Sequence, residues 1–99
     1  MDIADWRKRI DEIDEKLTKL LSERSHCVIE IGKIKRQRHL PIYDPEREKD
    51  IIARVTQNNR GPLKNDALTR LFERILDESR RVERLMAGEH LPEKGAKQS

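Results

Sequence analysis

The chain has 99 residues with a formal net charge of +3, and 41% of its residues are charged against 34% that are hydrophobic. This length allows one domain, and the single Trp, Tyr and Phe exclude a large aromatic core. The chain contains no run of about 18 apolar residues, and its charged N-terminus lacks the apolar segment of a secretory signal, so we expect a cytoplasmic protein.

The first predicted element is a helix over residues 3–38, about 54 Å long. Asp2 is a suitable N-cap, and Pro41 favours an end before it, because the residue that precedes a proline avoids the helical conformation. Apolar residues recur at helical spacing and form what we call the apolar seam: Ile3, Trp6, Ile10, Ile13, Leu17, Leu20, Cys27, Ile31 and Ile34. The rest of the chain is too short to cover such a rod, so we expect dimerisation along it.

A second helix is predicted to begin at Asp44 and Pro45, which are typical of an N-cap and a first helical residue, and to stop near Asn58. Its apolar face carries Ile51, Ile52 and Val55. No strand pattern or internal repeat follows, which favours an all-α fold.

A third helix is predicted to be capped by Asn65 or Asp66 and to end at Gly88. Its amphipathic stripe consists of Leu68, Leu71, Phe72, Ile75, Leu76, Val82 and Met86. Residues 89–99 are polar and are predicted to form a disordered tail or the remnant of a linker. The chain would then consist of one very long, one short and one medium helix.

Two basic residues interrupt the apolar face of the first helix. Arg24 takes a heptad position in the series of Ile10, Leu17 and Ile31, and Lys35, eleven residues later, shares its face. Because a buried cation requires an anion, both side chains are candidates for ligand binding. The alternative is an ion pair within the protein, with Glu48, or extension of both side chains to solvent.

Polar residues also continue the apolar faces of the other two helices. Arg47 and Glu48 lie one turn before Ile51 and Ile52, and Ser79 and Glu83 extend the third stripe. Helix capping explains Asp44 and Glu46 well, but it does not explain Arg47. Ser79 alone would more often bond back to its own helix.

Arg7 lies 17 residues before Arg24, or about 26 Å along a helix. It therefore cannot reach the same small ligand within one chain. In an antiparallel pair of long helices, it could instead complete the site of the partner. Taken alone, it would be interpreted as a solvated surface residue.

Together these residues predict a pocket in a helical bundle for a small ligand with more than one carboxylate and a hydroxyl. The mild net charge suits anionic small molecules better than nucleic acid. No activated nucleophile is visible, because Ser79 has no histidine on its stripe and Cys27, the only cysteine, is best explained as a residue of the apolar seam. No Cys/His cluster has the spacing of a zinc site, so the expected chemistry is electrostatic and conformational.

An ordered set of short motifs covers residues 4–86 and resembles the all-α chorismate mutases of the AroQ class. The motifs are Arg7-x-x-Ile10-Asp11-x-Ile13-Asp14, Leu20-Leu21-x-Glu23-Arg24, Ile31-Gly32-x-x-Lys35, Pro41-Ile42-Tyr43-Asp44-Pro45-x-Arg47-Glu48 and Leu71-Phe72-x-x-Ile75-x-x-x-Ser79. The resemblance implies an intertwined homodimer of three-helix chains, with residues 1–88 as the domain. It also implies the Claisen rearrangement of chorismate to prephenate, in phenylalanine and tyrosine synthesis, without a cofactor or metal.

By the same resemblance, Arg7 would enter the site from the partner chain. Arg24 and Arg47 would bind the substrate carboxylates with help from Ser79. Glu48 and the backbone around Asp44 would hold the ring hydroxyl, and Lys35 would donate to the ether oxygen whose bond breaks. Glu83 stands where the family often has glutamine, and a glutamate can donate in this way only when it is protonated. The expected catalytic residues are therefore Lys35, Glu83 and Arg24.

Other functions are also compatible with this sequence. Elimination of pyruvate from isochorismate occurs on the same fold, but such relatives usually lack the full Asp44-x-x-Arg47-Glu48 set. A non-catalytic helical module for dimerisation or regulation is an alternative of a different class, and nucleic-acid binding is the weakest one. The sequence leaves open whether a partner enzyme of aromatic amino acid synthesis is fused to the domain or docks onto it.

Overall fold

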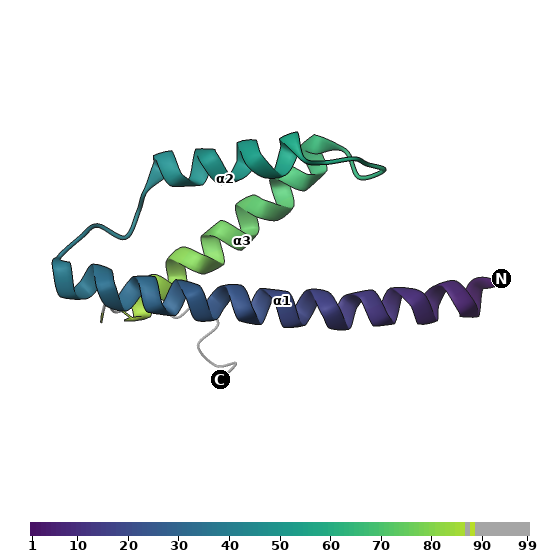
Figure 1. Ribbon diagram of the computed structural model, residues 1–99, viewed down its shortest axis with the longest axis horizontal. Coiled ribbons are helices and arrows are strands. Elements are labelled where there is room, and N and C mark those ends of the chain that lie inside the picture. The colour runs from purple at the N-terminus through teal and green to yellow at the C-terminus, as the bar shows by residue number, and fades with distance from the viewer. Residues whose placement is uncertain (87, 89–99) are drawn as a thin grey trace, which may run out of the picture.

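The computed structural model describes residues 1–86 and 88, and over this range it contains three helices and no strand (Figure 1). These are α1 (Ile3–Arg38), α2 (Pro45–Gln57) and α3 (Asn65–Met86). The all-α fold with one very long, one short and one medium helix is thereby confirmed. The tail predicted over residues 89–99 lies outside the described residues.

Local signals in the sequence explain where α1 begins and ends. Asp2 caps the helix in a reciprocal capping box with Asp5, in which each carboxylate accepts from the backbone N–H of the other residue. At the other end, His39 takes the left-handed conformation with φ 56°, and the N–H of Leu40 donates to the carbonyl of Lys35 at 2.9 Å. The helix thus ends before Pro41, as predicted.

The boundaries of α2 and α3 follow the prediction with one correction. Asp44 accepts from the N–H of Arg47 at 3.1 Å and caps α2, with Pro45 in the first turn. Asn65, however, is the first residue of α3 rather than its cap, because its side-chain oxygen accepts from Nδ2 of Asn59 in the preceding turn. The prediction of Asp66 as the alternative cap is also wrong, because Asp66 is the second residue of α3 and its carboxylate accepts from the adjacent N–H of Ala67.

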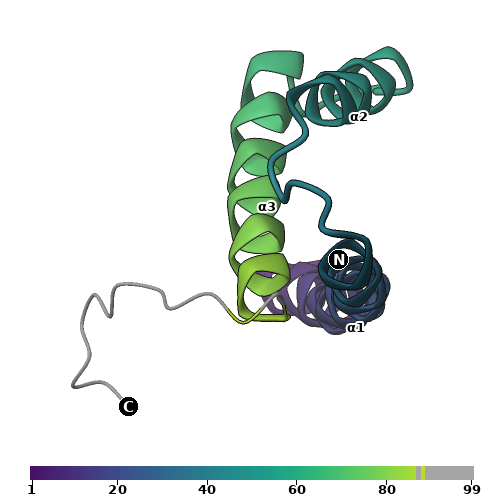
Figure 2. The same cartoon turned by 90° about the vertical axis from the view of Figure 1, so that its left-hand side faces the viewer.

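The three helices form an open frame rather than a compact bundle. α3 packs against both α1 and α2, whereas α1 and α2 lie apart and are joined by the connector, residues 39–44 (Figures 1 and 2). The Cα radius of gyration is 16.7 Å, compared with about 13 Å for a compact domain of this length. No helix in the described part of the chain is long and apolar enough to cross a membrane.

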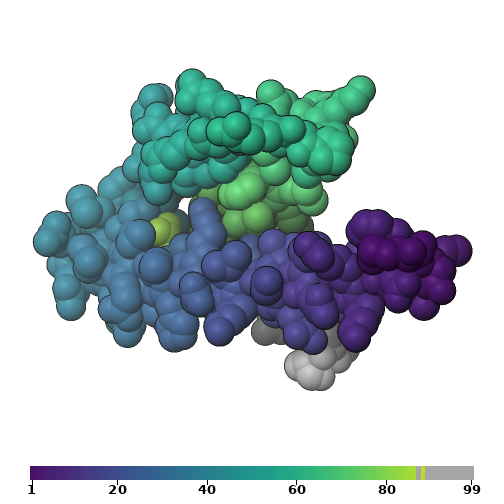
Figure 3. Space-filling view, turned by 45° about the vertical axis from the view of Figure 1, so that its right-hand side comes forward, coloured from purple at the N-terminus to yellow at the C-terminus, as the bar shows by residue number. Residues whose placement is uncertain are grey.

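One chain covers little of its own apolar surface. Among the described residues, the buried apolar side chains are Val28 and Leu76. The first six residues of the apolar seam, from Ile3 to Leu20, have exposed fractions between 51% and 67%. The N-terminal half of α1, which carries them, projects beyond the other helices (Figures 1 and 3). Such a long apolar stripe is typical of a helix–helix interface.

A glycine allows α1 and α3 to approach closely where they cross. Gly32 is buried, and a Cβ atom built at this position would lie 3.0 Å from Cβ of Met86 and 3.3 Å from Cα of Glu83. The missing side chain therefore brings Glu83 against α1, one turn from Lys35.

Candidate functional site

A cavity of about 390 Å³ lies between the three helices and the connector. Figure 3 shows the hollow between α1 and α2, with α3 behind it. Its polar lining contains seven of the eight residues predicted for the site, namely Arg24, Lys35, Asp44, Arg47, Glu48, Ser79 and Glu83, together with Arg80. Its apolar lining consists of Cys27, Val28, Ile31, Ile42, Ile51 and Leu76. The volume is in the range of small-molecule sites.

Lys35 and Glu83 form a shielded ion pair in this cavity. Nζ of Lys35 lies 3.2 and 3.3 Å from the two carboxylate oxygens of Glu83, and it also donates to the carbonyl of Ile42 at 3.0 Å. The two side chains are 17% and 11% exposed. The predicted alternative, an ion pair of Lys35 with Glu48, is wrong, because α3 crosses α1 here and brings Glu83 within reach.

Arg24 reaches across from α1 to α3, where its guanidinium donates to Oγ of Ser79. The hydroxyl of Ser79 in turn donates to the carbonyl of Ile75 at 2.9 Å. The predicted back-bond of Ser79 is therefore present, and the same oxygen also orients Arg24. Arg24 is half-buried and forms no ion pair within the described residues.

Arg47 lies at the exposed rim of the cavity, and it too lacks an ion pair in the part of the chain that the structure describes. The neighbouring carboxylate of Asp44 is used to cap α2. Arg24 and Arg47 therefore place two guanidinium groups, without carboxylate partners among the described residues, on two different helices of one cavity. Such groups bind carboxylates through paired hydrogen bonds.

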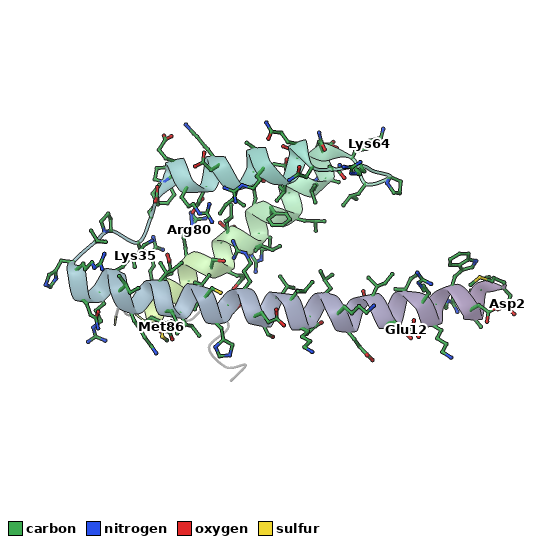
Figure 4. All side chains as sticks on the ribbon, viewed as in Figure 1. Asp2, Glu12, Lys35, Lys64, Arg80 and Met86 are labelled. Atoms are coloured by element: carbon green, nitrogen blue, oxygen red, sulfur yellow. The ribbon has the colours of Figure 1, made fainter. Side chains whose placement is uncertain are left out.

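Arg80, which was not predicted as a site residue, forms three contacts at the edge of the cavity. Its Nε lies 3.4 Å from Oε2 of Glu48, it donates to the carboxylate of Asp77, and its guanidinium carbon lies 5.4 Å from the ring centre of Tyr43. The hydrogen bond to Asp77, helped by the charge of Glu48, raises the pKa of Arg80 above its ordinary value. In Figure 4 the Arg80 and Lys35 side chains both lie in the space between α1 and α2.

A signal for Arg80 was nevertheless present in the sequence. Arg80 follows the buried Leu76 by four residues. The same spacing places Ser79 after Ile75 and Glu83 after Ser79. Two neighbouring rows of this stripe thus continue past its apolar part into the cavity: one carries Ser79 and Glu83, and the other carries Arg80.

Arg7 lies outside the cavity of its own chain, on the exposed N-terminal part of α1, as the helix spacing predicted. The described residues contain no group of three or more His, Cys, Asp or Glu side chains placed to hold a metal ion.

Comparison with known proteins places these observations in a family. Residues 6–84 match the family model of chorismate mutase type II. The bifunctional chorismate mutase/prephenate dehydratase of Pseudomonas aeruginosa is 41% identical over 75 residues, which are 71% of this chain and 20% of that protein. The chain thus spans about a fifth of the length of the curated bifunctional relatives that it matches.

Solved structures agree with this comparison. Chorismate mutase (form II) from Thermus thermophilus is similar with a TM-score of 0.81 and 37% identity, over 82% of this chain and 92% of that one. Chorismate mutase from Helicobacter pylori, solved in complex with prephenate, has a TM-score of 0.80 and 29% identity, over 90% of this chain and 97% of that one.

Proposed function

Since the chain belongs to the chorismate mutase type II family, we propose that it catalyses the rearrangement of chorismate to prephenate. The observation that carries this proposal is the cavity itself. It combines the guanidinium groups of Arg24 and Arg47, which have no carboxylate partner in the described part of the chain, with the shielded pair of Lys35 and Glu83. Chorismate has two carboxylates, a ring hydroxyl and an enol ether, and the cavity offers side chains that suit each of them.

The two arginines would fix the substrate by its carboxylates. Arg24, oriented by Ser79 on α3, would bind one carboxylate, and Arg47 on α2 would bind the other. Because both cations line one cavity of about 390 Å³, they would fix the two carboxylates within a confined space, which favours a folded substrate over an extended one. A chair-like conformer brings the two carbon atoms that will bond close together.

The ring hydroxyl would donate to the carboxylate of Glu48, close to the backbone of Asp44 at the start of α2. In the reaction itself, the ether C–O bond breaks as the new C–C bond forms, within one molecule and without a covalent enzyme intermediate. Lys35 would donate to the ether oxygen as negative charge develops there. One such preorganised donor typically contributes about 3 to 4 kcal/mol to the transition state.

Glu83 would act beside Lys35 at the ether oxygen. In its protonated form the carboxyl group donates a hydrogen bond, whereas its ionised form repels the developing charge and draws the Lys35 ammonium toward itself. We thus propose Lys35, Glu83 and Arg24 as the catalytic residues: Lys35 and Glu83 would act at the reacting ether oxygen, and Arg24 would hold a carboxylate of the substrate.

We further propose that the active unit is a homodimer in which Arg7 enters the site of the partner chain. The exposed apolar seam supports this arrangement, as does the position of Arg7 outside its own cavity. Relatives named as bifunctional proteins with prephenate dehydratase suggest that the partner enzyme consumes the product in aromatic amino acid synthesis. Residues 1–88 would form the catalytic domain, and its place of action would be the cytoplasm.

The decisive experiment supplies chorismate and isochorismate separately to the purified chain and follows both by NMR. The expected result is conversion of chorismate to a product of equal mass, prephenate, with no release of pyruvate from isochorismate. Arg24→Ala should abolish this turnover, whereas Arg38→Ala, on the exposed end of the same helix, should retain it. Pyruvate release would identify a lyase instead, and a folded dimer that converts neither compound would overturn the proposal.

A further inference from the structure

Arg80 connects three parts of the molecule at one edge of the cavity. It starts from α3, forms an ion pair with Glu48 on α2, and lies over the ring of Tyr43 in the connector. A further neighbour, Asp77, is one turn earlier on its own helix and accepts from the guanidinium. None of the roles proposed above uses this residue.

We propose that Arg80 is a positioning residue that fixes the hydroxyl-binding end of the cavity, by holding the Glu48 carboxylate on α2 and the Tyr43 ring of the connector. This inference rests on the proposed function, because the ligand group concerned is the ring hydroxyl of chorismate.

The geometry at Glu48 supports a positioning role. Nε of Arg80 faces Oε2 of the carboxylate at 3.4 Å, which leaves the other oxygen to accept from a ligand hydroxyl. The two side chains are 25% and 23% exposed, so the pair is more shielded than the surface pairs of this protein, such as Lys49 with Glu46 at 76% and 85%. An ion pair with this shielding restricts the carboxylate more than a solvated pair does.

The contact of Arg80 with Tyr43 also restricts the position of the connector. Two cations hold successive connector residues, since Lys35 donates to the carbonyl of Ile42 and Arg80 lies over the ring of Tyr43. Asp44, whose backbone we place beside the ring hydroxyl, is the next residue along the chain. Arg80 therefore acts on both groups that would hold the hydroxyl.

Asp77 anchors one edge of the Arg80 guanidinium to α3. With one edge bound to Asp77, the planar group can face Glu48 with Nε and present its flat surface to Tyr43. A lysine ammonium is a point charge and cannot form this set of contacts. We therefore expect Arg80→Lys to preserve the charge at this edge but not the position of Glu48.

The test compares chorismate with an analogue that lacks the ring hydroxyl. Arg80→Met should lower kcat/KM for chorismate by about tenfold, the loss expected when one charge-assisted hydrogen bond weakens, and should leave kcat/KM for the deoxy analogue near that of the parent. Glu48→Gln should show the same preference, and the double variant should be no worse than Glu48→Gln alone, because Arg80 acts through Glu48. Arg80→Lys should resemble Arg80→Met.

Two matched variants serve as controls. Arg74→Met removes an exposed arginine of α3 that pairs with Glu78, and Glu46→Gln removes an exposed carboxylate of α2 that pairs with Lys49. Both should keep the ratio of the two kcat/KM values at that of the parent. Tyr43→Phe should also keep it, whereas Tyr43→Leu should shift it in the direction of Arg80→Met.

An equal loss with chorismate and with the deoxy analogue would mean that Arg80 binds a substrate carboxylate directly, and this result would overturn the inference. An unchanged ratio in Arg80→Met would overturn it as well, while the proposed function would stand on the activity of the parent chain. If the parent chain neither binds nor converts chorismate, the proposed function fails, and the inference fails with it.

Discussion

Both carboxylate oxygens of Glu83 face the ammonium group of Lys35, at 3.2 and 3.3 Å. Lys35 also donates to the carbonyl of Ile42, so its three N–H groups have protein acceptors close by. An ether oxygen that approaches Lys35 must therefore compete with Glu83. This relationship makes the protonation state of one carboxyl group decisive for the proposed reaction.

The first prediction concerns pH. We expect kcat/KM to be lower at alkaline than at acidic pH, because an ionised Glu83 offers no hydrogen-bond donor and holds Lys35 more strongly. Glu83→Gln should flatten this pH dependence, since an amide donates at every pH. The raised pKa of Arg80 keeps that residue charged throughout, so it adds no limb of its own. A pH profile of kcat/KM that is identical in the parent and in an active Glu83→Gln variant would contradict the assignment.

The second prediction concerns Lys35. Lys35→Ala should reduce kcat by about 100-fold or more and weaken binding far less. The reason is that the ether oxygen, to which Lys35 would donate, gains charge mainly in the transition state. Arg24→Ala should weaken binding and turnover together, since a carboxylate is present throughout the reaction. Steady-state kinetics with calorimetric binding of prephenate separates the two effects. An unchanged kcat with a raised KM in Lys35→Ala would be inconsistent with this role.

The third prediction concerns the origin of Arg7. Arg7→Ala and Arg24→Ala chains should each be inactive, but a mixture refolded together should regain about a quarter of the parent activity. Half of the dimers would then be mixed, and each mixed dimer would have one complete site and one site with both defects. Mass spectrometry of the intact dimers verifies that mixing took place. Mixed dimers as inactive as the two parents would show that Arg7 does not cross to the partner chain.

The fourth prediction concerns the crossing of α1 and α3. Gly32→Ala gains about 1 kcal/mol of helix propensity, but its new methyl group would meet Met86 and the backbone of Glu83. Overpacking of this kind costs about 1 to 3 kcal/mol, and it separates Glu83 from Lys35. We therefore expect a lower thermal midpoint together with a lower kcat/KM. A variant that unfolds at a higher temperature and keeps its kcat/KM would contradict this explanation of Gly32.

Much of this architecture was predictable because its signals are local. Asp2 and the Asp44-Pro45 pair mark helix starts by chemistry that acts within one turn, and the spacing of apolar residues fixes the inner face of each helix. The same periodicity brought Arg24 and Lys35 to one face, and both line the cavity.

Pairing between helices was less predictable. The sequence offers Glu48 as an ion-pair partner of Lys35, whereas the structure pairs Lys35 with Glu83 and pairs Glu48 with Arg80. Which carboxylate meets which cation depends on the crossing of α1 and α3, and that crossing depends on the absence of a side chain at Gly32. The periodicity of a single helix contains no information about the angle at which a second helix crosses it.

The exposed apolar seam has a consequence for the stability of the protein in solution. In the proposed homodimer, a chain that shields few of its apolar side chains by itself would gain stability from association with a second copy, so that folding and association would form a single equilibrium. The unfolding midpoint should then rise with the total concentration of chains, and dilution should melt the protein at constant temperature. In a cell, the fraction of intact protein would depend on how much of it is synthesised, and scarce chains would be open to proteolysis.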